Sequence, residues 1–248
     1  MNISHISDLH GKPPRGNKSA DILIISGDLA PNNVDNFAFY YKGALIPQKR
    51  VSQLSRLGMK AFDFRKIDTK AEAIYQTDWI HKVALPTIKQ RGFALDDVIF
   101  VNGNHDFFDP TDIFPNSLFQ GSKTITLGGK KFGLVSGVLP YVNEWNDEVS
   151  DDVIQERIAS LDPDIDALVT HVPPYGILDD GYDAVSIGSQ SVARAIFGKH
   201  SSDTPYFTKL RLHTFGHAHD SRGKAKHEIE GRHIVFSNAS ETRFDLSL

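Results

Sequence analysis

Five short segments of the sequence carry side chains that could do chemistry. They are Asp8-Leu9-His10, Gly27-Asp28, Gly103-Asn104-His105-Asp106, His171 and Gly216-His217-Ala218-His219. Together they offer carboxylate oxygens, imidazole nitrogens and an amide oxygen, which are hard or borderline ligands that suit Mn, Fe or Zn. The chain contains no cysteine, so any metal must be held by His, Asp, Glu or Asn. These residue types therefore predict a metal site without sulfur ligands.

The segments differ in how often each motif is expected by chance, and therefore in how strongly each one indicates a functional site. An Asp-x-His triplet or a Gly-Asp pair is expected by chance about once or twice in a chain of this composition. Gly-His-x-His is expected roughly 0.04 times, and Gly-Asn-His-Asp roughly 0.004 times. Each residue alone also has an ordinary interpretation, such as a turn for Asp8 or a strand end for His171. The ordered set is what indicates a shared site.

Each segment follows a predicted β-strand. Short apolar and β-branched runs predict strands at Ile3–Ile6, Asp21–Ser26, Val98–Val101, Thr124–Leu127, Phe132–Val135, Ala167–Thr170 and His213–Phe215, and a terminal hairpin of Ala225–Ile229 and His233–Phe236. Loops at strand ends are where α/β proteins gather side chains from distant parts of the chain. We therefore expect the five segments to meet on one rim of an α/β fold.

Three segments show helical periodicity. Thr69–Gln90 places apolar side chains on one expected face, namely Ala71, Ile74, Tyr75, Trp79, Val83 and Ile88. Val153–Leu161 stops before Pro163, and Ser189–Phe197 is followed by Gly198, a common residue at helix ends. The aromatic-rich stretch 33–65 has no clear assignment. With no repeat and no linker, residues 1–248 are expected to form one domain.

Composition limits the class of protein. A chain of 248 residues with 40% hydrophobic and 23% charged residues is typical of a folded globular protein. A net charge of −4, without a basic block, disfavours stable binding of duplex DNA. No apolar run approaches the roughly 20 residues that a membrane helix needs, and the first residues do not resemble a signal peptide. We therefore expect a cytoplasmic protein with no membrane partner.

The order of the motifs, D-x-H, G-D, G-N-H-D, H and G-H-x-H, resembles that of the calcineurin-like metallophosphoesterase superfamily. The resemblance runs from Asp8 to His219. It implies a four-layer α/β sandwich of two mixed β-sheets flanked by helices. The string Thr170-His171-Val172-Pro173-Pro174 is also similar to a pattern in the MPPED-type phosphodiesterase branch.

The resemblance implies two adjacent metal ions with shared ligands. The implied ligands are Asp8, His10 and His219 for one metal, Asn104, His171 and His217 for the other, and Asp28 as the bridge. Mn²⁺ is the expected activator in vitro, although Fe, Zn or Ni suit the same ligands. His105 would assist the leaving oxygen as an acid, and Asp106 would hold the His105 ring in the right tautomer.

The implied reaction is hydrolysis of a small phosphodiester, such as a cyclic nucleotide, by a hydroxide held between the metals. A phosphomonoesterase or a nuclease on the same site is the alternative, and a non-catalytic metal-binding scaffold is the alternative from another class. Only 29 residues follow His219, too few for the added domain of the related nucleases. After Asp28 the chain also lacks the arginine of the related protein phosphatases. The oligomeric state, and the part that the segment 33–92 plays, are left open.

Overall fold

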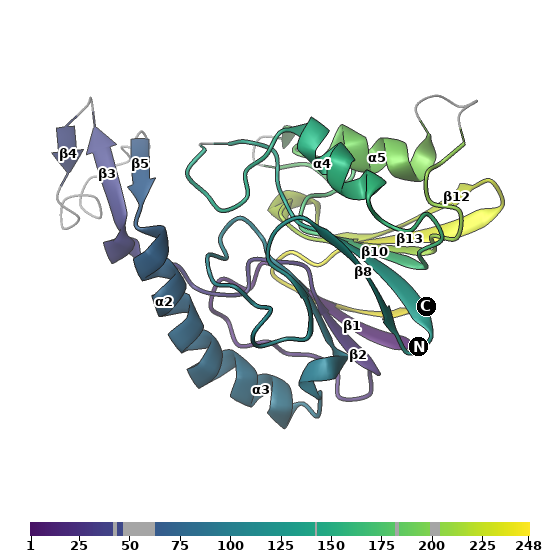
Figure 1. Ribbon diagram of the computed structural model, residues 1–248, viewed down its shortest axis with the longest axis horizontal. Coiled ribbons are helices and arrows are strands. Elements are labelled where there is room, and N and C mark those ends of the chain that lie inside the picture. The colour runs from purple at the N-terminus through teal and green to yellow at the C-terminus, as the bar shows by residue number, and fades with distance from the viewer. Residues whose placement is uncertain (42–43, 47–62, 142, 182–183, 199–203) are drawn as a thin grey trace.

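Two β-sheets lie face to face, and helices cover the outer face of each sheet (Figure 1). The computed structural model describes residues 1–248 apart from 42–43, 47–62, 142, 182–183 and 199–203. One cluster of buried apolar side chains lies between the two sheets. A second cluster lies between the first sheet and its helices, and a third lies between the second sheet and its helices. The expected four-layer α/β sandwich is therefore confirmed.

Both large sheets are mixed. The first has the strand order β14-β1-β2-β6-β7, with bounds Arg243–Ser247, Asn2–Ile6, Ile22–Ile25, Val98–Val101 and Asn116–Leu118. The second has the order β12-β13-β11-β10-β9-β8, with bounds Gly223–Ile229, Arg232–Asn238, Leu212–Phe215, Ala167–Thr170, Lys130–Val135 and Ser122–Leu127. The strands pair in parallel except β14, β12 and β8, which pair antiparallel at sheet edges. Every strand expected from the sequence is present.

The central strands are apolar on both faces because both faces are covered. In β2, Leu23 and Ile25 contact the helix side of the first sheet, whereas Ile22 and Ile24 face the second sheet. This alternation follows from strand geometry, in which successive side chains point to opposite faces. Burying each such side chain contributes about 1.5–3 kcal/mol. These buried strands form the rigid frame from which the candidate ligand loops extend.

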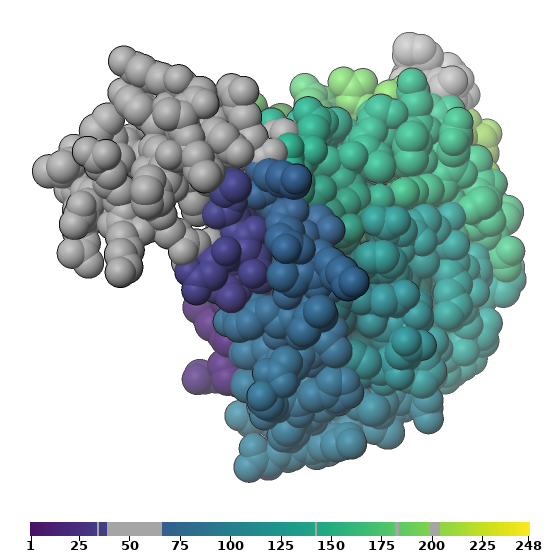
Figure 2. Space-filling view, turned by 60° about the vertical axis from the view of Figure 1, so that its left-hand side comes forward, coloured from purple at the N-terminus to yellow at the C-terminus, as the bar shows by residue number. Residues whose placement is uncertain are grey.

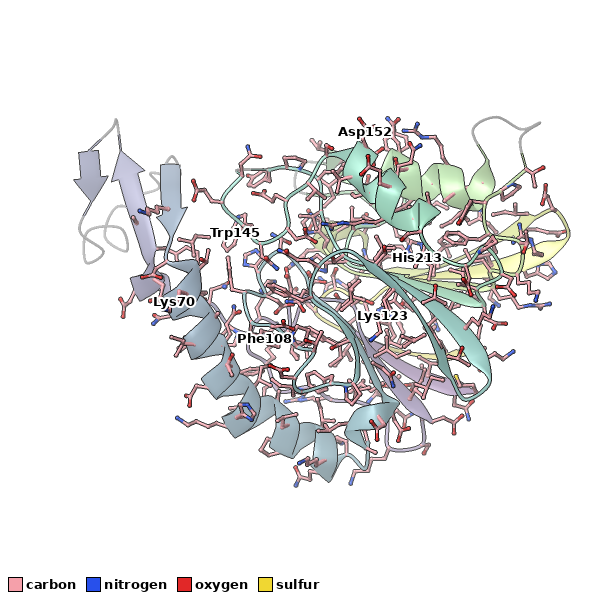
Figure 3. The ribbon with its side chains drawn as sticks, in the orientation of Figure 1. Lys70, Phe108, Lys123, Trp145, Asp152 and His213 are labelled. Atoms are coloured by element: carbon pink, nitrogen blue, oxygen red, sulfur yellow. The ribbon has the colours of Figure 1, made fainter. Side chains whose placement is uncertain are left out.

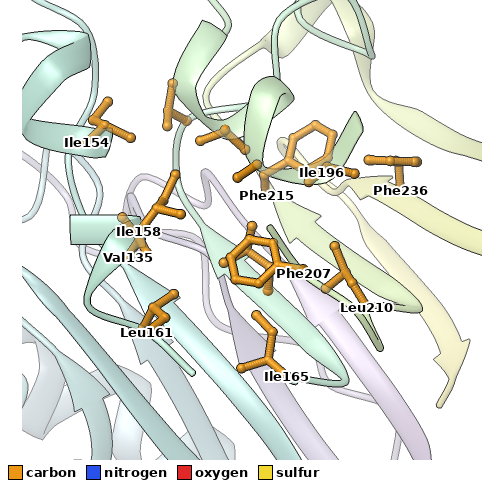
Figure 4. Packing of buried hydrophobic residues seen from close by; sticks show 14 of the residues in the cluster. Val135, Ile154, Ile158, Leu161, Ile165, Ile196, Phe207, Leu210, Phe215 and Phe236 are labelled. Carbon is orange, nitrogen blue, oxygen red and sulfur yellow. The ribbon is translucent and has the colours of Figure 1, made fainter. Parts of the chain in front are cut away.

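Helices α4 (Asp151–Ala159) and α5 (Gln190–Phe197) cover the second sheet. Each begins after a serine whose side chain accepts a hydrogen bond from a backbone N–H in the first turn of the helix, which is a common N-cap. Figure 4 shows Ile154, Ile158 and Ile196 directed from these helices toward the sheet. No helix in the described part of the chain is long and apolar enough to cross a membrane.

The predicted helix Thr69–Gln90 is present as α2 (Thr69–Trp79), a π-helical turn η2 (Ile80–Ala84) and α3 (Leu85–Gln90). Pro86 explains the irregular turn because it has no N–H to donate to the preceding turn. In the first half, the predicted apolar face is wrong. Ile74 and Tyr75 are 64% and 38% exposed, while Glu72 and Gln76 are fully buried. The inward face of α2 is therefore polar.

A small third sheet precedes α2. It has the order β4-β3-β5, with bounds Ala44–Ile46, Phe37–Tyr41 and Asp63–Ile67, and both pairings are antiparallel. It lies at one side of the molecule, beyond the N-terminal end of α2 (Figure 1), and Figure 2 shows the blue segment of α2 and α3 on the face turned toward the viewer. Asp68 follows β5 and caps α2 by accepting a hydrogen bond from Ala71 N. Residues 47–62 of the unassigned stretch lie outside the described part of the chain.

Candidate metal centre

The five segments meet where the parallel strands of both sheets end. Asp8 follows β1, Asp28 follows β2 and Asn104 follows β6 in the first sheet. In the second sheet, His171 directly follows β10, and His217 comes two residues after β11. The carboxyl ends of parallel strands therefore bring the predicted ligands to one rim, as expected for an α/β fold.

Four of the candidate ligands have left-handed backbone conformations. The φ angles are 54° at Asp8, 43° at His10, 53° at Asp28 and 68° at His217. Such angles cost about 1–3 kcal/mol for residues other than glycine and collect at functional sites. Here each sharp turn directs a side chain back toward the rim instead of continuing the strand.

Two motif glycines are required by close approach. A Cβ atom on Gly103 would lie 2.1 Å from Asp28 Oδ1, and one on Gly216 would lie 2.1 Å from Asp8 Oδ2. Both distances are far below van der Waals contact. The glycines before Asn104 and His217 therefore let the buried carboxylates lie directly against the backbone.

The donor atoms form two overlapping groups. Those of Asp8, His10 and His219 lie within 4.8 Å of one another, as do those of Asp8, Asp28 and His171. Asp28 Oδ2 is 3.3 Å from His171 Nε2 and 3.9 Å from His10 Nε2, so it lies between a candidate ligand of each metal. The rings of His171 and His217 are 5.0 Å apart. Six of the seven predicted ligands are thus close together, and Asn104 precedes His105, whose backbone N–H donates to Asp28 Oδ1 at 2.8 Å.

Two buried polar atoms in this centre support a cation. Asn104 Oδ1 has no hydrogen-bond partner in the described part of the chain, and His171 Nε2 lies 3.3 Å from Asp28 Oδ2 without the geometry of a hydrogen bond. An unsatisfied buried polar atom costs about 1–3 kcal/mol, and native proteins contain few of them. His171 Nδ1 is 2.6 Å from the carbonyl oxygen of Ser26, which can only accept, so Nδ1 carries a proton in that bond. His171 Nε2 is the nitrogen left to face the ligand group, which fits a metal ion.

The electrostatics of the site also suit a cation. Burial lowers the pKa of His171, but the carboxylates of Asp28 and Asp8 outweigh it and raise that pKa to about 10. Burial raises the pKa of Asp8, but His171 and the hydrogen bond from His219 outweigh it and lower that pKa to about 2. Burial lowers the pKa of His217 to about 3, which keeps this imidazole neutral, as a metal ligand must be. The buried carboxylates therefore favour positive charge beside them.

Asp106 does not hold the His105 ring, contrary to the sequence-based expectation. Its two carboxylate oxygens accept hydrogen bonds from four backbone N–H groups, those of Asp28, Leu29, Ala30 and Gly103, at 2.7–3.2 Å. The side chain that meets the ring is Asn32, whose Oδ1 is 2.6 Å from His105 Nδ1. Asp106 therefore fixes the backbone of two ligand loops, and sequence reasoning missed Asn32.

A tryptophan loop lies over His105. The rings of Trp145 and His105 have centroids 3.9 Å apart. Asn146 holds this loop to the ligand loop, because its backbone N–H donates to Asn104 O at 3.0 Å and its side chain donates to Asp106 O at 2.7 Å. A hollow of about 330 Å³ adjoins Trp145, which is labelled with Lys70 in Figure 3. It is lined by Thr69, Lys70, Phe107, Phe119, Glu144, Trp145, Asn146 and Asp147.

Several solved structures align with the chain at low identity. A structure described as a putative 5′-nucleotidase from Staphylococcus aureus is 11% identical with a TM-score of 0.45, covering 100% of this chain and 51% of that one. The protein TT1561 of Thermus thermophilus is 13% identical with a TM-score of 0.45, covering 97% and 90%. The NAD nucleotidase of Haemophilus influenzae is 10% identical with a TM-score of 0.42, covering 100% and 47%. This chain thus spans about half the length of the two nucleotidases.

No curated protein matches the chain. The profile of the family described as calcineurin-like phosphoesterase matches residues 1–221, which include all five motif segments. The motif order, the four-layer sandwich and the cluster of ligands on one rim agree with that match. The chain belongs to the calcineurin-like phosphoesterase family.

Proposed function

We propose that the chain is a hydrolase of small phosphoesters that binds two metal ions in this centre and prefers phosphodiesters. The observation that carries the proposal is the cluster of buried carboxylates and imidazoles, together with two buried atoms, Asn104 Oδ1 and His171 Nε2, that form no hydrogen bond. A purely structural cluster would leave both atoms unsatisfied for no gain.

The ligands divide between the two metals by their neighbours. We assign Asp8, His10 and His219 to one metal, Asn104, His171 and His217 to the other, and Asp28 to both. The assignment of Asp28 is supported by the place of Oδ2 between His171 and His10. Two cations in such a site supply Lewis acidity toward a phosphoryl group and a nucleophile at neutral pH.

His105 is the group that protonates the leaving oxygen. Burial lowers the pKa of His105 to about 4, so the ring of the free protein is neutral at pH 7. An anionic phosphoester beside the ring raises its pKa, because an opposite charge within about 4–6 Å favours the protonated form. Proton transfer from a positioned acid contributes typically 10²–10⁴-fold to rate.

The preference for diesters has one support, and a substrate that carries a nucleobase has another. One is the string from Thr170 to Pro174, which resembles that of a phosphodiesterase branch. The other is the hollow of about 330 Å³ beside Trp145, which is at the small end of the range for ligand pockets. Its aromatic walls and its Lys70 and Glu144 side chains suit a flat group with a polar edge, such as a nucleobase.

The test compares bis(p-nitrophenyl) phosphate with p-nitrophenyl phosphate, using metal-stripped protein with and without added Mn²⁺. The variant Asp28→Asn removes the shared charge and keeps the shape, and Asp152→Asn, on the exposed surface of α4, is the matched control. We expect Mn²⁺-dependent cleavage of the diester that Asp28→Asn abolishes and Asp152→Asn retains. Preference for the monoester would overturn the substrate class. No turnover by folded, metal-loaded protein would favour the scaffold alternative.

A further inference from the structure

The buried face of α2 connects to the candidate leaving-group acid through polar side chains. Glu72 and Gln76 are one helical turn apart and are both 0% exposed. Gln76 Nε2 donates to His105 O at 2.7 Å, and Gln76 Oε1 accepts from Phe107 N at 2.6 Å. Glu72 Oε1 accepts from Asn32 Nδ2 at 3.0 Å. The helix therefore meets the His105 loop and the Asn32 loop by hydrogen bonds rather than by apolar packing.

The partners of Asn32 settle which way its amide faces. Asn32 Nδ2 lies 3.0 Å from Glu72 Oε1 and 3.1 Å from the carbonyl oxygen of His105, and both of these atoms only accept hydrogen bonds. The Nδ2 atom must therefore be on that side. Asn32 Oδ1 is then the atom 2.6 Å from His105 Nδ1. Because an amide oxygen only accepts, Nδ1 must carry a proton.

We propose that Asn32 and Glu72 are positioning residues for the reaction, and that they hold His105 in the tautomer whose Nε2 faces the metal centre. Glu72 orients Asn32, and Asn32 orients the ring. This inference rests on the proposed role of His105. His105 acts as the imidazolium, with a proton on each ring nitrogen: the Nε2 proton passes to the ester oxygen as the bond from phosphorus to that oxygen breaks, and Nδ1 keeps its proton on Asn32 throughout.

Glu72 is well suited to orient an amide because other donors already fix its own position. Besides Asn32, it accepts from Asn33 N at 2.9 Å and from Asn36 Nδ2 at 2.7 Å. These three donors compensate the burial of the carboxylate. Asn36 donates to Oε2 of the same carboxylate, whereas Asn32 donates to Oε1, so Asn36→Leu also removes one donor from Glu72 but leaves the bond from Asn32 to His105 in place and serves as the matched control.

The test uses three variants with two readouts. Asn32→Leu removes the acceptor at nearly constant shape, and Asn36→Leu is the control. The double variant Asn32→Asp with Glu72→Gln rebuilds the connection with donor and acceptor exchanged, since the glutamine amide can donate to the new carboxylate. The first readout is the imidazole ¹⁵N shifts of His105 in metal-free protein, which report the tautomer without any turnover. The second is kcat for methyl phenyl phosphate and for methyl p-nitrophenyl phosphate.

We expect the Nδ1–H tautomer in the wild-type protein, in Asn36→Leu and in the double variant, and its loss in Asn32→Leu. We also expect Asn32→Leu to lose at least about tenfold in kcat on the phenyl ester but less than about threefold on the nitrophenyl ester, whose leaving group needs little protonation. Equal losses on both esters, or an unchanged tautomer in Asn32→Leu, would overturn the proposal. If the wild-type protein cleaves neither ester, the proposed function fails, and the ¹⁵N shifts still decide the positioning.

Discussion

His213 makes the folded protein sensitive to acid. Its Nε2 is 2.9 Å from Thr170 Oγ1, and that hydroxyl already donates its proton to Val172 O at 2.6 Å. His213 Nε2 must therefore be the donor in this pair. Nδ1 has no partner in the described part of the chain, and the ring packs against Phe215 and Phe236 with centroids 4.8 and 6.0 Å away. A second proton on His213 would place a charged N–H among apolar side chains.

The sign and size of the effect follow from the pKa. Burial and, to a lesser extent, the neighbouring His5 lower the pKa of His213 from 6.5 to about 3. Between pH 6.5 and pH 3 the unfolded chain therefore binds a proton at this position and the folded chain does not. Stability falls as the pH falls, by about 1.4 kcal/mol per pH unit. At pH 5 the loss from this one group is about 2 kcal/mol.

The assay is urea unfolding of EDTA-treated protein at pH 7.5 and pH 5. His213→Phe keeps a ring in the site and cannot take up a proton, so it should lose about 2 kcal/mol less than the wild-type protein between the two pH values. His227→Phe, which changes an exposed histidine of β12, should match the wild-type loss. The comparison concerns the change with pH, so any baseline cost of the larger ring cancels. Equal losses in His213→Phe and wild type would refute the reasoning.

Three further outcomes are expected. Removing Mn²⁺ from a solution at about 100 times its Kd should lower the free energy of unfolding by about 2.7 kcal/mol, and an unchanged unfolding curve would count against a metal centre. Gly216→Ala should abolish metal binding in calorimetry, because its Cβ would lie 2.1 Å from Asp8 Oδ2, whereas Gly223→Ala, with its nearest neighbour at 3.7 Å, should bind normally. Arg157→Met leaves the buried Asp147 carboxylate without the guanidinium that lies 2.6 Å away, so urea unfolding should show a loss of about 3–5 kcal/mol, and a loss below about 1 kcal/mol would contradict it.

The strands were the most predictable part of the fold. Runs such as residues 22–25 and 98–101 are apolar at every position. A run of four apolar residues is too short for a buried helix, so it indicates a strand whose two faces are both covered. The edge strands β7 and β14 were missed. β7 is three residues long, and β14 alternates exposed polar side chains with the partly buried Phe244 and the buried Leu246 over five residues. Their place depends on pairing with β6 and β1, which local sequence does not encode. That residues 1–248 form one domain stays a prediction.

The ligands could be found from the sequence, whereas the residues that orient them could not. A ligand must be Asp, His or Asn at a strand end, so its type and place carry information. Asn32 is an ordinary loop residue by type, and its role appears only when helix α2 brings Glu72 beside it. The helical pattern of the sequence led to a wrong prediction of the inward face of α2. It placed Ile74 and Tyr75 on that face, whereas the structure buries Glu72 and Gln76 there. Hydrogen bonding to two site loops outweighs the burial of those two apolar side chains.

The pairing of β1 with β2 explains why the first two motifs predict a site so well. The parallel register that joins Ile6 to Ile25 continues past the strand ends. Asp8 N donates to Gly27 O, His10 N to Asp28 O and Gly11 N to Leu29 O, each at 3.0 Å. These bonds hold the left-handed turns at Asp8, His10 and Asp28, whose strain they help to offset. The ligand geometry is therefore set by the sheet before any metal binds, so substitutions that disturb this pairing should weaken metal binding without touching a ligand.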